Sequence, residues 1–205
     1  ILGKDFKTAV TELSGENLHY SQAKENANLQ TAEQKLAEKP KVVLPERDNN
    51  LKKVYAYLIN SRGIDKELIN QLVKEKLLYQ DKKGNAVFVH KDEKGEIVGA
   101  EIQGTNTFKK FKGVAEGTSN SVFIFQNGEP KKAYVFESAI DLLSFKMIAN
   151  QDKINDSILV SMAGLKATPI LKLQEQGIKI LSCVDNDVAG KEFNFKNNFI
   201  ACNKA

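Results

Sequence analysis

The chain has 205 residues, of which 41% are hydrophobic, and its 30 basic and 26 acidic side chains give a net charge of +4. This length allows one medium domain or two small ones with buried cores. The mildly basic balance is compatible with a nucleic-acid partner but is not evidence for one. No apolar stretch is long enough to span a bilayer, and the first residues show no secretory pattern. Two cysteines without a Cys-x-x-Cys pair exclude a zinc ribbon or a disulfide framework within this span, and they fit a reducing cytoplasm.

Residues 1–44 are predicted to be the tail of a preceding domain followed by a linker. Phe6, Val10 and Leu13 recur at helical spacing before Ser14 and Gly15 end the helix. Residues 17–44 are rich in Gln, Asn, Lys, Glu and Ala, which is typical of a linker or a solvated helix. Because the chain does not begin with Met, we expect it to be a piece of a longer protein.

Residues 45–130 are predicted to form a small α+β subdomain. It begins with a helix over 51–62 that Gly63 ends, and continues with a second helix that Asp65 caps. Residues 86–90 and 96–100 alternate with a period of two and flank Asp92-Glu93-Lys94-Gly95, which predicts a β-hairpin. A further strand is expected over 122–125.

Residues 131–205 show a more regular alternation of strands and helices. Strands are predicted over 133–137, 158–162 and 178–184, each followed by a helix. The second helix is expected to begin with Thr168 as its N-cap and Pro169 as its first residue. This order predicts an α/β domain with a parallel sheet and right-handed crossovers.

Three carboxylates fall at the predicted carboxyl ends of two strands of this sheet. Glu137 ends the first strand, and Asp185 and Asp187 follow the third. A lone strand-end glutamate is usually solvated, and Asp-Asn-Asp is usually turn chemistry. Both features at one end of one sheet favour a shared cation, because ligands of open parallel sheets collect there. Three clustered carboxylates would repel one another, and a bound Mg²⁺ or Mn²⁺ would relieve this repulsion. Both cations prefer oxygen ligands and leave positions for phosphate.

These residues resemble the Toprim domain that bacterial primases, topoisomerases and some nucleases share. Its acidic motifs match Glu137-Ser-Ala-Ile-Asp141 and Asp185-Asn-Asp187-Val-Ala-Gly190-Lys191. The resemblance implies a Rossmann-like sheet flanked by helices, catalytic residues Glu137, Asp141, Asp185 and Asp187, and metal ligands Glu137, Asp185 and Asp187. Lys191 matches the basic residue after Ala-Gly, which the resemblance places near nucleic acid. Ser138 stands where the family usually has glycine, so turnover is less strongly implied than metal binding.

The region before residue 131 is similar to the one that precedes Toprim in bacterial primases. Residues 57–64 resemble its Tyr-Leu-x-x-Arg-Gly helix, and residues 92–99 resemble its hairpin. Residues 5–13 resemble the helix that closes the primase zinc ribbon, which would lie outside this chain. The combination looks most like primase-like proteins of plasmids and other mobile elements. It implies single-stranded DNA and nucleotides as partners, together with replication or conjugation proteins, and no membrane.

A basic and aromatic segment, Phe108-Lys109-Lys110-Phe111-Lys112, follows the predicted hairpin. Lysines contact phosphates and aromatic rings stack on unpaired bases in single-strand binders, so these five residues are candidate nucleic-acid contacts. The alternative is that the phenylalanines fill the core while the lysines face water.

The leading functional hypothesis is metal-dependent nucleotidyl or phosphoryl transfer on single-stranded DNA, as in a DNA primase. A Toprim nuclease would use the same residues. A catalytically silent DNA-binding module is the third possibility, and Ser138 is the feature that favours it. The two histidines have no Ser or Cys partner in a recognisable arrangement, so a hydrolase triad has no support.

Overall fold

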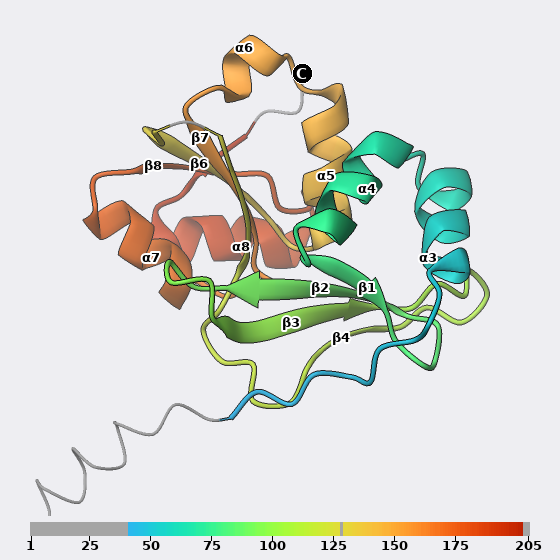
Figure 1. The fold of residues 1–205 in the computed structure, drawn as a ribbon. Helices are drawn as coiled ribbons and strands as arrows, with labels where there is room; N and C mark the ends of the chain where they lie inside the picture. Colours follow the sequence, from blue (N-terminus) through green and yellow to red (C-terminus); the bar gives the residue numbers. More distant parts are fainter. Residues whose placement is uncertain (1–40, 128, 203–205) are drawn as a thin grey trace, which may run out of the picture. The chain divides into compact units, whose positions relative to one another are not determined.

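The computed structural model describes residues 41–127 and 129–202, which form two β-sheets with helices (Figure 1). The helix and most of the linker predicted for residues 1–44 lie outside the described residues. The described part begins with helix α3 (Lys52–Ala56), which continues as the π-helix η1 (Tyr57–Ser61), and with α4 (Lys66–Lys74). Gly63 follows η1 with φ +66°, a conformation that glycine adopts without strain, so the predicted helix stop is confirmed.

The first sheet is antiparallel, with strand order β1-β2-β3-β4. The predicted hairpin joins its two long strands. Its turn is held by Asp92, whose Oδ1 accepts hydrogen bonds from the N–H groups of Lys94 and Glu96 at 3.0 Å each. The strands are β1 (Leu78–Gln80), β2 (Ala86–Lys91), β3 (Ile97–Gln103) and β4 (Lys112–Val114).

The second sheet has the order β5-β7-β6-β8-β9, and its neighbours from β7 to β9 are parallel. Strand β5 pairs antiparallel with β7, so the sheet is mixed rather than purely parallel. The strand that we assigned to the preceding subdomain therefore belongs to this sheet. The sequence did not indicate this pairing, because the paired residues lie 30 to 38 positions apart in the chain. The strands are β5 (Phe123–Asn127), β6 (Lys132–Phe136), β7 (Ser157–Ser161), β8 (Lys179–Ser182) and β9 (Ile200–Ala201).

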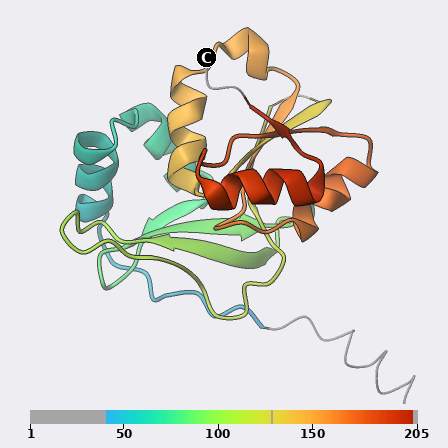
Figure 2. The ribbon, with the colours of Figure 1, turned by 180° about the vertical axis from the view of Figure 1, so that it is seen from behind.

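Helices cover both faces of the second sheet (Figures 1 and 2). Ile180 of β8 packs in a core with Phe193 of α8, whereas Leu181 packs against the core that contains Leu142 of α5. This alternation follows from the two-residue period of a strand. The helices are α5 (Ala139–Ile148), α6 (Gln151–Ile154), α7 (Thr168–Glu175) and α8 (Val188–Asn197). The N-cap of α7 is Ala167, one residue before the predicted cap. None of the helices in the described ranges is long and apolar enough to cross a bilayer.

The two sheets share one hydrophobic core through an aromatic contact. Phe88 of β2 and Phe123 of β5 are both fully buried, and their rings meet edge to face with centroids 5.6 Å apart. Phe123 thus ties the second sheet to the first.

Replacing Phe123 with alanine should lower the free energy of unfolding by about 3–5 kcal/mol, the usual cost of truncating a buried phenylalanine. Chemical denaturation of both proteins measures the difference. Phe195→Ala is the matched control, because Phe195 is 85% exposed and its removal should leave stability nearly unchanged. Equal effects of the two substitutions would contradict the role given to Phe123.

Candidate functional site

The parallel pairing of β6 with β8 brings two predicted site residues together. Glu137 directly follows β6, and Asp185 lies just beyond the end of β8. The backbone N–H of Asp185 donates a hydrogen bond of 3.0 Å to Oε1 of Glu137. The first and third strands of the predicted alternation are thus neighbours in the sheet, and the loops after them meet at one edge.

Asp187, the third predicted ligand, begins helix α8. Its Oδ1 accepts a 2.8 Å hydrogen bond from the N–H of Gly190, so the side chain is the N-cap of the helix. A Cβ at position 190 would lie 2.0 Å from the carbonyl oxygen of Asp185, which explains why glycine stands there. The capping bond uses one oxygen of the carboxylate and leaves Oδ2 for other partners.

The chemistry of these donors fits a hard divalent cation. Mg²⁺ in proteins is commonly held by one or two carboxylates together with waters and substrate phosphates. The half-buried Glu137 and the exposed Asp185 are such a pair. Among the described residues, no group of three or more His, Cys, Asp or Glu side chains is close enough to hold a metal. The three-residue ligand set therefore stays a prediction.

Ser138, the departure from the Toprim pattern, is the N-cap of α5. Its hydroxyl donates a 2.6 Å hydrogen bond to Oδ2 of Asp141 and accepts one of 3.3 Å from the N–H of Asp141. Its backbone is extended, with φ −140° and ψ 156°, so no glycine is required at this position. Asp141 is thus the partner of the capping serine, and its predicted catalytic role stays a prediction.

Glu101 of β3 is a buried carboxyl group beside the candidate site, and the sequence reasoning did not identify it. Its side chain is only 3% exposed and reaches from the first sheet to the start of α5. Both carboxylate oxygens accept from the N–H of Ala139, at 3.1 and 3.0 Å, and Oε2 also accepts from the Ser161 hydroxyl at 2.8 Å. Burial raises the pKa of Glu101 to about 7, although the hydrogen bonds from Ser161 and Ala139 act in the opposite direction.

A cavity of about 300 Å³ places this buried carboxylate beside the predicted site. Its lining includes Glu101, Glu137, Lys112 of β4 and Lys166 of the loop after β7. Lys112, a predicted nucleic-acid contact, is therefore close to Glu137. Since lysines attract phosphate and carboxylates attract cations, this cavity has the charges that a cation-bound phosphate requires.

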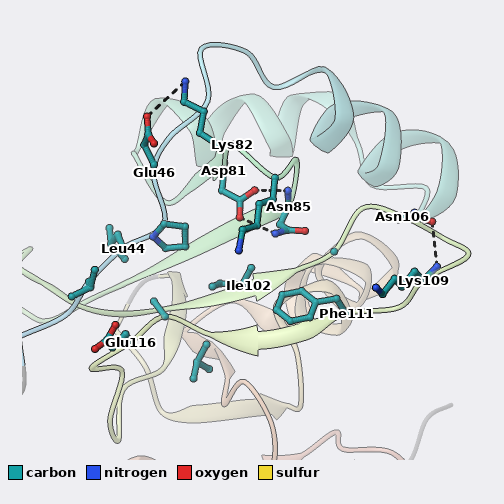
Figure 3. Close-up of a pocket in the computed structure, with 16 residues that line it drawn as sticks. Leu44, Glu46, Asp81, Lys82, Asn85, Ile102, Asn106, Lys109, Phe111 and Glu116 are labelled. Atoms are coloured by element: carbon teal, nitrogen blue, oxygen red, sulfur yellow. Dashed lines mark hydrogen bonds and ion pairs between the residues drawn. The ribbon is translucent and has the colours of Figure 1, made fainter.

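The other predicted nucleic-acid residues lie in different places. Phe108 is fully exposed and Phe111 is 47% exposed, so the alternative that both phenylalanines fill the core is wrong. Lys110 is also exposed in this loop. Phe111 and Lys109 line a groove of about 810 Å³ on the first sheet, where residues 43–46 form the opposite wall (Figure 3). Lys191 of α8 lines a third cavity with Asp185.

The pH dependence of stability tests the state of Glu101. The folded chain keeps a proton on this carboxyl up to about pH 7, whereas the unfolded chain releases it near the ordinary pKa of 4.5. The free energy of unfolding should therefore fall as pH rises from about 4.5 to 7 and then level off, by about 3 kcal/mol in total. Glu101→Gln should remove this decline, because an amide oxygen accepts the same bonds without titrating.

Denaturation series from pH 5 to 8 on both proteins provide the measurement. Burial lowers the pKa of His90 to about 3, so His90 makes stability rise with pH up to about 6.5. That opposite trend is common to both proteins and cancels in the comparison. Parallel stability curves would show that Glu101 is ionised throughout.

Family models match two adjacent parts of the chain. Residues 134–204 match the model described as Toprim-like, and residues 56–131 match that of a protein of unknown function, DUF3991. The crystal structure of the primase fragment of the bacteriophage T7 primase-helicase protein is similar with a TM-score of 0.52. It is 21% identical, and the match covers 81% of this chain and 72% of that one. This likeness shows a shared fold.

Two curated relatives are longer than this chain. An uncharacterized protein of Bacillus anthracis, pXO2-78, is 36% identical over 152 residues, covering 67% of this chain and 44% of the relative. A 65 kDa protein of Zymomonas mobilis is 29% identical over 163 residues, covering 75% of this chain and 26% of the relative. The chain thus spans less than half the length of either. Together with the strand order and the two acidic motifs, the matches identify residues 134–204 as a Toprim-like domain within a primase-like fold.

Proposed function

We propose that the chain is the catalytic part of a primase-like protein that transfers nucleotidyl groups on a single-stranded DNA template. The observation that carries the proposal is the contact between Glu137 and Asp185, which joins the two acidic motifs of a Toprim-like domain at one sheet edge. The T7 primase fragment, whose fold the chain shares, supports the same class of reaction.

Glu137 and Asp185 would hold Mg²⁺ or Mn²⁺, with the second oxygen of Asp187 as a further ligand. The bound cation would neutralise and orient phosphate oxygens during transfer. The hydrogen bond from the Asp185 N–H fixes one oxygen of Glu137, so its carboxylate is oriented before any substrate arrives.

Lysines from three separate elements surround this pair and would bind phosphates. Lys112 and Lys166 line the cavity that contains Glu137, and Lys191 lines the cavity that contains Asp185. A phosphate that approaches from either cavity would thus meet a lysine ammonium group. Phe108 and its neighbouring lysines would hold single-stranded template farther out on the first sheet.

The designation pXO2 in the name of the Bacillus relative fits a protein of a plasmid. We therefore place the activity in replication or transfer of a mobile element in the cytoplasm, with other replication or conjugation proteins as partners. A Toprim nuclease is the alternative reaction at the same residues. A silent DNA-binding module was favoured by Ser138, but the capping bonds of its hydroxyl to Asp141 weaken that argument.

A primer-synthesis assay tests the proposal, using the whole protein, single-stranded DNA, nucleotides and Mg²⁺ or Mn²⁺. Glu137→Gln should lower product formation by roughly a hundredfold or more, since charge stabilisation by a bound cation contributes several kcal/mol. Glu175→Gln, at an exposed position near the end of α7, is the matched control and should keep full activity.

The outcomes separate the three readings of the site. Metal-dependent products that Glu137→Gln leaves unchanged would refute the assigned site. Degradation of the DNA instead of primer synthesis would establish the nuclease. Retained DNA binding without any product would establish the silent module.

The exposed phenylalanine of the basic loop should contribute to template binding. Phe108→Ala should weaken binding of a single-stranded oligonucleotide by about tenfold, because stacking on one base contributes about 1–3 kcal/mol. Fluorescence anisotropy gives the dissociation constants. Phe195→Ala removes another highly exposed phenylalanine, on α8, and should have no effect. Equal affinity of the Phe108 variant and the native protein would place the template elsewhere.

A further inference from the structure

The two cysteines of the chain meet at one place in the second sheet. Strand β9 pairs in parallel with β8, and this pairing sets Ser182 beside Ala201. The N–H of Cys202 donates to the carbonyl oxygen of Ser182 at 2.6 Å, so the hydrogen bonding continues past the end of β9. The next pair of residues in this register is Cys183 with Cys202.

Both cysteine side chains lie on the same face of the sheet. Cys183 belongs to the hydrophobic core that contains Leu142 of α5, and Cys202 packs against the same core. The N–H of Cys183 also donates to the carbonyl oxygen of Val135 in β6 at 2.8 Å, so its backbone is held within the sheet. Because paired residues of neighbouring strands point to the same side, the register and the packing agree.

The spacing of this pair suits a disulfide bond. Neighbouring strands of a sheet lie about 4.8 Å apart. A disulfide joins residues whose Cα atoms are roughly 4.4–6.8 Å apart and whose side chains point toward the same side. The pairing of β8 with β9 meets both conditions at Cys183 and Cys202, so a bond between them requires little movement of the backbone.

Core packing does not account for both cysteines. Cys183 is only 8% exposed, which is usual for a cysteine that serves as a small apolar side chain. Cys202 is partly exposed and follows the edge strand of the sheet, where a small apolar side chain contributes less. The pair thus combines a sheltered thiol with one that small molecules can reach, which is typical of redox-active cysteine pairs.

We propose that Cys183 and Cys202 are a modification site, at which a small-molecule disulfide such as oxidised glutathione reversibly introduces a disulfide bond. The more exposed Cys202 sulfur attacks the glutathione disulfide, forms a mixed disulfide and releases one reduced glutathione. The Cys183 sulfur then attacks the Cys202 sulfur and releases the second. The two cysteines lose two electrons and two protons, and the two released glutathione thiols carry them. Disulfides of reducing compartments are usually transient bonds of this kind.

The bond would close a loop that contains the second acidic motif. Residues 184–201 lie between the two cysteines and include Asp185, Asp187 and the whole of α8. A cross-link between the ends of a segment reduces the conformational freedom of its open state. Oxidation should therefore make α8 and β9 resist local unfolding.

Peptide mapping by mass spectrometry, on the whole protein treated with oxidised glutathione, tests the proposal. Trypsin cleaves after Lys179, Lys191 and Lys196, so the two cysteines fall in the separate peptides 180–191 and 197–204. Digestion should release these two peptides joined to each other, and dithiothreitol should separate them. Amide hydrogen exchange within residues 188–197 should be roughly tenfold or more slower in the oxidised protein than in the reduced protein.

A double variant that keeps the number of cysteines is the matched control. Ala201→Cys combined with Cys202→Ala moves the thiol to the adjacent position, whose side chain points to the opposite face of the sheet. This variant should not form the link to Cys183. Cys183→Ser should instead retain glutathione on Cys202, because the sulfur that would release it is missing.

The proposal is overturned if the native protein yields only glutathione adducts, only links between two copies of the chain, or no modified cysteine. Equal linkage in the double variant would also refute it, because the bond would then not depend on the register. Unchanged hydrogen exchange in a linked protein would refute the stabilising effect on α8. Because these readouts are masses and exchange rates, they are independent of primer synthesis and of the proposed function.

Discussion

The carboxylate of Glu101 crosses from the first sheet into the second and accepts hydrogen bonds from Ala139 and Ser161. Ala139 begins α5, two residues after Glu137, and Ser161 ends β7, the strand next to β6. Burying a carboxyl group is costly unless donors surround it, and here a backbone N–H and a hydroxyl meet that requirement. A residue of the first sheet thus holds the backbone next to Glu137, so both sheets contribute to the surroundings of this carboxylate.

Short backbone contacts extend this constraint around the site. The N–H of Gly164 donates to the carbonyl oxygen of Glu137 at 2.8 Å, and the N–H of Met162 donates to that of Phe136 at 3.0 Å. The loop after β7 thus holds the backbone carbonyl oxygen of Glu137, and the loop after β8 holds its Oε1. A side chain that is fixed in this way loses little freedom when a substrate binds, which favours precise chemistry over a flexible surface site.

Local patterns predicted the parts of this fold that depend on neighbours in sequence. The hairpin around Asp92, the stop at Gly63 and the strand-helix alternation after residue 131 are all of this kind. The approach of Glu137 to Asp185 was also predictable, because the carboxyl ends of parallel strands lie at one edge of a sheet. The strand that pairs with β5 was not predictable, because nothing in residues 122–125 indicates to which of the two sheets they belong. Glu101 was missed because a glutamate in an alternating strand normally marks the solvent face, whereas β3 is buried on both faces here.

The charges around the acidic pair do not neutralise one another. The ion pairs among the described residues are Lys82 with Glu46 and Lys196 with Glu192, all at exposed positions away from the pair. Lys112, Lys166 and Lys191 line the flanking cavities, yet none of them is within ion-pair distance of Glu137 or Asp185. A fold stabilised by these charges would bring them into contact. Their separation fits the proposed function, in which the carboxylates would hold a cation and the ammonium groups would bind phosphates.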